Sequence, residues 1–218
     1  MTRALATTAA RPAHVRDGAA TRLSIEREAL RLFARRGYDA TSIRDISLAV
    51  GVADAALYRY FKSKEELGRA IFQDHYGRLA RDIMAVRESG LGFPAKIAAL
   101  VELMCALFDG TPDVFVFIMT NLHDHLRFVP DGAQENAVAA LHEIMRDAIR
   151  DGELAPGDAD LLAALALGIV TQPAIFHLYG RLQGPLASHR AELTQTVLRA
   201  LGVTATAQVK LARGGKRG

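Results

Sequence analysis

Apolar residues recur at helical spacing along almost the whole chain. In the first such segment, Thr21 to Arg36, they fall at positions i, i+4, i+7 and i+8 of one helical face: Ile25, Ala29, Leu32 and Phe33. No stretch shows the alternating, β-branched pattern and hairpin turns of a sheet. The pattern predicts an all-α protein of about nine helices, at residues 21–36, 41–50, 53–60, 64–88, 94–108, 113–128, 133–151, 158–180 and 187–201.

The second and third predicted helices are short, and a tight turn at Gly51 joins them. Ser42 and Asp45 resemble a capping box at the start of the second helix, and Ser63 and Glu66 form a similar pair before the fourth. The expected inward faces carry Ile43, Ile46, Ala49 and Val50, followed by Leu57 and Phe61. Two short helices packed on a first helix are typical of a helix-turn-helix DNA-binding domain.

The third helix has an outer face suited to the DNA major groove, where base edges carry a distinguishable code. Small residues allow its backbone to approach the groove, and hydroxyl and guanidinium groups can reach the bases. These residues are Ala53, Asp54, Ala55, Ala56, Tyr58, Arg59 and Tyr60. Lys62 and Lys64 follow at the start of the fourth helix, where cations and free backbone N–H groups suit phosphate.

The segment from Arg22 to Phe72 resembles the DNA-binding domain of the TetR (tetracycline repressor) family. The resemblance is carried by Ala29, Phe33, and the runs 36–38, 41–46, 49, 51–52 and 57–67. It implies that Tyr58 and Lys64 contact phosphates. It also implies that Thr41, Ser42 and Arg44 hold the second helix against the DNA backbone. Base reading would fall to exposed residues among Ala53, Asp54, Ala55, Arg59 and Tyr60.

Asp54 departs from the family pattern, because members often carry a cationic or neutral residue at this place. A carboxylate beside DNA is either repelled by phosphate or accepts a hydrogen bond from a cytosine amino group. A third role is to cap the N-terminus of the third helix, and this is the role we expect.

The 218 residues carry a formal net charge of +3, which is unevenly distributed. Residues 1–66 carry 12 basic and 8 acidic side chains, residues 67–203 carry 11 and 16, and residues 204–218 carry 4 basic side chains alone. A basic front suggests that this part meets a polyanion. We therefore expect a flexible basic arm at 1–19, the helix-turn-helix domain at 20–66, a helical ligand-binding and dimerisation domain at 67–203, and a basic tail at 204–218.

The remaining chemistry is sparse. Cys105 is the single cysteine, which excludes an internal disulfide and fits a reducing compartment, and its apolar surroundings predict a buried, inert thiol. His123 and His125 are two residues apart and would diverge on a helix, so we expect no metal site and no cofactor.

Membrane association is not expected from the sequence. The longest apolar run, Leu161 to Tyr179, is interrupted by Gln172 and Pro173. The first residues lack the continuous apolar segment of a secretory signal. These observations predict a soluble, cytoplasmic protein without a membrane partner.

Residues 67–203, which carry a net negative charge, resemble the TetR family only in their helical layout. The resemblance implies that the last two helices form a four-helix bundle with a second copy, through Leu161, Leu162, Leu165, Ile169, Leu193, Val197, Leu198 and Leu201. The alternative is that these residues form an intramolecular core. The resemblance also implies an apolar ligand pocket, for which the candidates are Met104, Phe108, Phe115, Met119, Leu122, His123, Gln172, Phe176 and His177.

Together these features predict a homodimeric, ligand-responsive repressor that binds a palindromic operator in double-stranded DNA and is released by a small, largely apolar effector. One alternative is a constitutive DNA-binding regulator without a ligand. Another is an all-α enzyme, but the sequence lacks a Gly-rich phosphate loop, an H-E-x-x-H motif and a Gly-x-Ser-x-Gly elbow.

Overall fold

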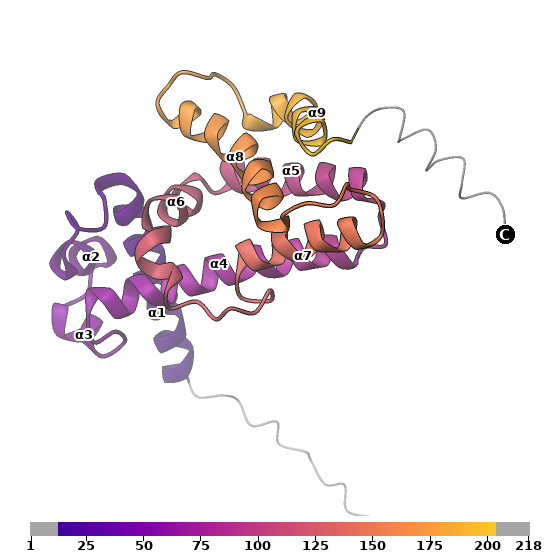
Figure 1. Cartoon of the computed structure of the whole chain (residues 1–218). Coiled ribbons are helices and arrows are strands. Elements are labelled where there is room, and N and C mark those ends of the chain that lie inside the picture. Colours follow the sequence, from indigo (N-terminus) through magenta and orange to yellow (C-terminus); the bar gives the residue numbers. More distant parts are fainter. Residues whose placement is uncertain (1–12, 204–218) are drawn as a thin grey trace, which may run out of the picture. The chain divides into compact units, whose positions relative to one another are not determined.

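The structure is a computed structural model that describes residues 13–203 (Figure 1). Within this range the chain forms nine α-helices and one short 3₁₀ helix and no strand, which confirms the all-α prediction. The chain separates into two compact units after Ile71, whereas the sequence placed the boundary after Glu66. The predicted basic tail and residues 1–12 of the predicted arm lie outside the described residues.

The first helix is longer than its apolar pattern suggests. α1 covers Ala13–Arg36, so it begins before the expected Thr21 and includes part of the predicted flexible arm. Alanine and arginine account for half of residues 13–20, and both favour helix without adding an apolar stripe. The predicted stripe is buried, as expected, at Ile25, Ala29, Leu32 and Phe33.

The helix-turn-helix consists of α2 (Ile43–Val50) and α3 (Asp54–Tyr58), and α2 contacts both α1 and α3. The predicted capping box is formed: the Asp45 backbone N–H donates to Ser42 Oγ over 3.2 Å, and the Ser42 N–H donates to the Asp45 carboxylate over 2.8 Å. The Ser42 hydroxyl also donates to the Asp45 carboxylate, and this bond, followed by the one from the Ser42 N–H, lowers the pKa of the Asp45 carboxyl. Gly51 ends α2 with a φ of +78°, in the left-handed region that glycine adopts without strain.

The inward face of α2 differs from its prediction. Ile46 is buried, but Ile43 and Val50 are half-buried and Ala49 is exposed. Ser47 takes the inward place beside Ile46, and its hydroxyl donates to the Ile43 carbonyl over 3.0 Å. Because this hydroxyl is satisfied within the helix, a polar residue can occupy the core position that the apolar pattern assigned elsewhere.

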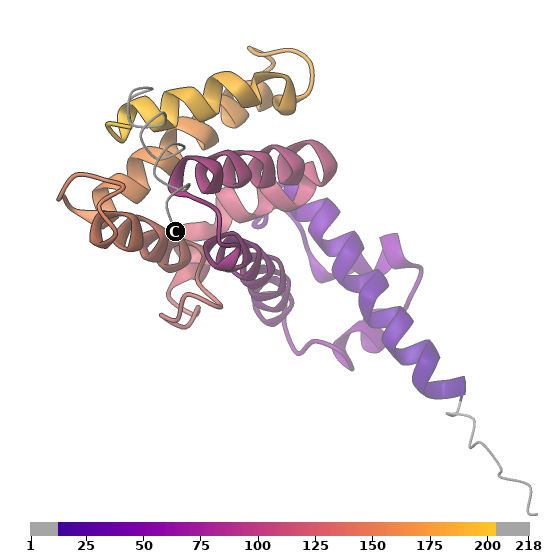
Figure 2. The ribbon, with the colours of Figure 1, turned by 90° about the vertical axis from the view of Figure 1, so that its right-hand side faces the viewer.

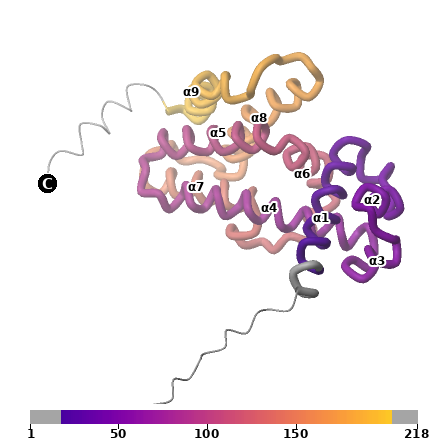
Figure 3. Tube along the Cα trace, turned by 180° about the vertical axis from the view of Figure 1, so that it is seen from behind, coloured from indigo at the N-terminus to yellow at the C-terminus, as the bar shows by residue number. Residues whose placement is uncertain are grey.

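The second unit begins at Phe72, within α4 (Lys64–Glu88). Its other helices are α5 (Phe93–Gly110), α6 (Pro112–Leu126), α7 (Ala137–Arg150), α8 (Ala159–Leu178), the 3₁₀ helix η1 (Leu186–His189) and α9 (Arg190–Ala200). α5 is central here: α9 lies on one side of it, and α4 and α7 lie on the other (Figure 2, Figure 3). Its buried residues, such as Ile97 and Phe108, form much of this unit's core.

Charged side chains tie α4 to α7. The Arg87 guanidinium donates to the Asp147 carboxylate over 2.7 Å and lies 3.1 Å from a Glu143 carboxylate oxygen. Arg150 also donates to Asp147, over 2.8 Å. These contacts, with the Arg87 hydrogen bond as the largest cause, hold the pKa of Asp147 below its ordinary value. Nearer the middle of α4, the Tyr76 hydroxyl lies 3.3 Å from the side-chain oxygen of Asn136, which caps α7.

Gly51→Ala should destabilise the front unit by about 1–2 kcal/mol, because an L-residue in the left-handed region brings its Cβ too close to the backbone. Urea denaturation followed by circular dichroism measures this loss. Gly110→Ala is the control: Gly110 ends α5 without a positive φ and no atom lies within 4 Å of an added Cβ. Equal losses in the two variants would contradict the role given to Gly51.

Asp147→Asn should lower the free energy of unfolding at neutral pH by about 1 kcal/mol, since it weakens a charge-assisted hydrogen bond. The folded-state pKa of Asp147 is depressed, so its stabilisation is complete above the ordinary value of 3.8 and is lost as pH falls through the folded pKa. The native chain should therefore lose stability below that value more steeply than the variant. Thermal melts at a series of acid pH values test this. Asp124→Asn is the control: it changes an exposed carboxylate and should leave the dependence of the melting temperature on pH as it is in the native chain.

Candidate nucleic-acid interface and effector cavity

α3 is fixed from its inner side and open on its outer side. Leu57 and Phe61 are fully buried, as predicted. Ala53, Ala55 and Arg59 are exposed, Tyr58 is 51% exposed, and Tyr60 is half-buried. The structure therefore brings a guanidinium and a phenol to the outer face of one short helix.

Asp54 does not form the predicted cap. Ala53 is the N-cap residue of α3, no side-chain hydrogen bond caps this helix, and Asp54 is its first residue. A cap needs the residue before the first helical turn, and the chain places the small Ala53 there. The exposed Asp54 carboxylate interacts favourably with the positive end of the helix, and contact with a base stays a prediction.

The residues before α2 divide into buried and exposed groups. Thr41 is only 1% exposed, and its hydroxyl donates to the Gly37 carbonyl over 2.9 Å. Ser42 is exposed but its hydroxyl is engaged in the capping box, and Arg44 is exposed. Thr41 thus shapes the turn before α2, while Ser42 and Arg44 lie where a partner could reach them.

The two lysines differ in their surroundings. Lys62 is exposed, whereas Lys64 is half-buried. The Lys64 ammonium donates to the Tyr38 carbonyl over 3.0 Å and lies 4.5 Å from the centre of the Tyr38 ring. Tyr38 packs in turn on Phe33, with ring centres 4.9 Å apart. Lys64 is therefore oriented by an aromatic residue of the turn after α1.

Sequence reasoning gave Tyr38 and Gly68 no role at this site. A Cβ added to Gly68 would lie 2.7 Å from Cε2 of the Tyr38 ring, closer than carbon atoms approach. Only glycine lets α4 pass this close to the ring. A glycine inside an otherwise helical pattern was the available signal, because it often marks a close contact.

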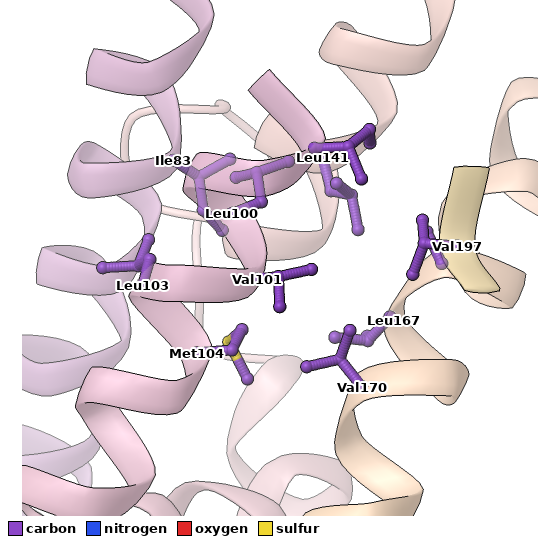
Figure 4. A pocket seen from close by; sticks show the side chains of 11 residues that line it. Ile83, Leu100, Val101, Leu103, Met104, Leu141, Leu167, Val170 and Val197 are labelled. Carbon is purple, nitrogen blue, oxygen red and sulfur yellow. The ribbon is translucent and has the colours of Figure 1, made fainter. Parts of the chain in front are cut away.

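An interior cavity lies in the second unit among α4, α5, α7, α8 and α9 (Figure 4). Its free volume is about 50 Å³, and its walls are apolar. The lining residues are Ile83, Ile97, Leu100, Val101, Leu103, Met104, Leu141, Ala166, Leu167, Val170 and Val197. Of the predicted ligand residues, Met104 lines this cavity. Three further lining residues share a helical stripe on α5 with Met104, since Ile97, Leu100, Val101 and Met104 fall at i, i+3, i+4 and i+7.

The remaining predicted ligand residues lie elsewhere. Phe108 and Phe115 are buried and pack edge to face with ring centres 5.1 Å apart, and His177 contacts the Phe108 ring. Met119 and Leu122 are half-buried, and His123, Gln172 and Phe176 are exposed. These aromatic and methionine side chains therefore belong to the core or to the surface of the unit. The cavity is lined mainly by aliphatic residues of α5 and α8.

The predicted dimer residues also fall into two groups. Leu193, Val197, Leu198 and Leu201, in and just after α9, are buried within the single chain, so the intramolecular alternative describes them. On α8, Leu161 is 58% and Leu165 44% exposed, while Leu162 and Ile169 are half-buried. By length and hydropathy α8 could also cross a membrane, and 22% of its apolar window is buried. α8 therefore presents an uncovered apolar face.

Cys105 has the apolar surroundings that its sequence neighbours predict, whereas the two histidines differ from each other. Cys105 is buried, and burial, followed by the charges of Asp109 and Glu102, raises the pKa of its thiol to about 11. His123 is exposed, but His125 is buried against the Phe72 ring. Between residues 13 and 203, no three His, Cys, Asp or Glu side chains gather as a metal site would require.

Comparison with known proteins identifies relatives of the front of the chain. The profile described as "Bacterial regulatory proteins, tetR family" matches residues 25–71. The HTH-type transcriptional repressor KstR2 of Rhodococcus jostii (strain RHA1) is 43% identical over 84 residues, which are 37% of this chain and 39% of KstR2. The chain spans 35% and 39% of the length of two further HTH-type regulators that it matches.

Solved structures share the fold of the whole described chain. A TetR family transcription regulator from Marinobacter aquaeolei VT8 superposes with a TM-score of 0.71 at 19% identity, over 86% of this chain and 98% of that one. The regulator FadR from Bacillus subtilis, solved in complex with stearoyl-CoA, gives 0.69 at 18% identity, over 84% and 98%. Residues 25–71 thus carry a DNA-binding domain of the TetR type, and the all-helical layout of the chain agrees with the fold of these solved structures.

Proposed function

We propose that the protein is a cytoplasmic, ligand-responsive repressor of transcription that binds a palindromic operator as a homodimer. The observation that carries the proposal is α3, whose inner face is anchored by Leu57 and Phe61 and whose outer face exposes Tyr58 and Arg59. A short helix held in this way can enter the major groove. The repressor KstR2, which resembles the front of this chain, supports negative regulation.

The contacts divide into three roles. Arg59, with Tyr60 and the small residues Ala53 and Ala55, faces the bases. Tyr58, Arg44, Ser42 and Lys62 approach phosphates, and Lys64 joins them, because its ammonium has three donors and Tyr38 accepts one. Thr41 is a positioning residue, since its hydroxyl is used by the Gly37 carbonyl.

The dimer is proposed to form through α8. Leu161, Leu165 and Ile169 repeat every four residues and so share one helical face with Leu162 beside them. Covering this face with the same face of a second copy removes apolar surface from water and brings together two reading helices. Two half-sites give the specificity that one short helix lacks.

The effector is proposed to be small and largely apolar, and to bind in the second unit. The interior cavity has apolar walls, and FadR, which shares the fold, was solved with stearoyl-CoA. A ligand that binds one conformation of this unit better than another shifts the population between them, and the shift is limited by that difference in affinity.

A constitutive regulator without an effector is the second candidate. The interior volume of about 50 Å³ favours it, because ligand pockets are usually several times larger. A thermal-shift screen separates the two candidates, since a molecule that binds the native chain raises its melting temperature.

Lys62→Ala should weaken operator binding equally for all sequences and reduce the slope of log K against log salt by about one, because one phosphate contact is lost. Arg59→Ala should cost about 1–3 kcal/mol and relax the sequence preference. Fluorescence anisotropy with duplexes from the gene's own upstream region measures both. Arg181→Ala removes an exposed charge from the second unit and should leave binding unchanged; a loss equal to that of Lys62→Ala would argue against the assigned interface.

Leu165→Glu should convert the dimer to a monomer, because it places a charge in an apolar contact. Light scattering after size exclusion should give twice the chain mass of 23.6 kDa for the native protein and one chain mass for the variant. Leu91→Glu changes a leucine of similar exposure outside α8 and should remain dimeric. A native monomer, or a native chain recovered with membranes, would rule out the α8 dimer.

A further inference from the structure

Two hollows of the second unit share one side chain. Beside the interior cavity lies a cleft of about 350 Å³ between α4, α5 and the start of α6. Its lining residues are His75, Arg78, Leu79, Asp82, Leu103, Ala106, Leu107, Thr111 and Val114. Leu103 also lines the interior cavity, on the side that faces α4 in Figure 4. This half-buried leucine thus borders both the cleft and the cavity.

The cleft has a mostly apolar lining, but unlike the cavity it also carries the polar side chains of His75, Arg78, Asp82 and Thr111. Burial lowers the pKa of His75, so its imidazole is neutral near pH 7 and can both donate and accept a hydrogen bond. Arg78 is already paired with Asp74, one turn earlier on α4. Asp82, one turn later, adds a second carboxylate to this face. The charges of Asp74, Arg78 and Asp82 sum to −1.

We propose that the cleft and the cavity form one bipartite site for an elongated amphipathic molecule with an uncharged polar end. Its apolar chain displaces Leu103 and enters the interior cavity, while a hydroxyl, ester or ketone group stays in the cleft beside His75 and Arg78. The inference rests on the proposed function, because it specifies the effector of the same unit.

The charge of the cleft selects the uncharged end. A free carboxylate or phosphate would face Asp82 and would compete with Asp74 for the Arg78 guanidinium. A cation would face that guanidinium directly. An uncharged group avoids both conflicts and can use the neutral imidazole as a partner, and a hydroxyl can also donate to Thr111 Oγ1, whose own proton is donated to the Leu107 carbonyl over 3.0 Å.

The small volume of the interior cavity agrees with a ligand whose alkyl chain displaces side chains as it enters. Leu103 and Met104 line the cavity, and both have side chains that change rotamer without moving the backbone. A narrow alkyl chain needs less displacement than a bulky ring. Binding of the ligand would then affect α4 directly, because this helix carries both Ile83 of the cavity and His75 of the cleft.

Isothermal titration calorimetry of the full chain with 1-decanol and with sodium decanoate tests the proposal. The two probes share an alkyl chain and differ in the charge of the end group. We expect decanol to bind at least about tenfold more tightly, because decanoate places a poorly compensated charge in the cleft. Asp82→Asn should strengthen decanoate binding about threefold and leave decanol binding unchanged. Equal affinities for the two probes, or no binding of decanol, would overturn the proposal.

Leu103→Phe should weaken decanol binding about tenfold, since a bulkier side chain closes the passage. Leu91→Phe, the same change outside both hollows, should have no effect. If Leu103→Phe does not fold, Leu107→Trp replaces it. The chain has no tryptophan of its own, and Leu107 lines the cleft but not the cavity. Decanol should then change the tryptophan emission at the concentrations that calorimetry gives, and unchanged emission would contradict occupancy of the cleft.

A parallel operator-binding assay separates this inference from the proposed function. Decanol that binds without releasing the operator would leave the bipartite site standing and refute its role as an effector site. Operator binding by a chain that takes up neither probe would refute the bipartite site and leave the DNA-binding role intact.

Discussion

The front of the molecule depends on the burial of Leu57 and Phe61 beneath α3. A helix of five residues is too short to be stable alone, so its packing decides both its existence and its direction. Burying each side chain contributes about 1.5–3 kcal/mol relative to an exposed one. With the inner face fixed, the intervening residues Tyr58 and Arg59 must face outward, and their exposure follows from two core contacts.

Most of the front could be predicted from the sequence because its signals are local. The Ser42 cap, the left-handed Gly51 and the α1 stripe each depend on neighbours within a few residues along the chain. The errors have the same origin. Asp54 was expected to cap α3, but which residue precedes the first turn depends on where the preceding turn ends, and here it is Ala53.

The second unit was predictable as a set of helices but not as a site. The cavity is lined by single residues and short stripes from five helices, far apart in sequence, and their aliphatic side chains carry no chemical signal. Whether a leucine of α8 or α9 faces the core or the solvent depends on which helices pack beside it. The sequence treated Leu165 and Leu198 alike, yet the structure exposes the first and buries the second.

The uncovered face of α8 affects how operator occupancy depends on the concentration of the protein. If that face is covered by a second chain, the DNA-binding species forms in proportion to the square of the free chain concentration while monomers predominate. Occupancy of an operator would then rise steeply around a threshold of protein concentration rather than gradually. A modest change in the synthesis or degradation of the chain would thus act as a sharper control than the same change in a monomeric regulator.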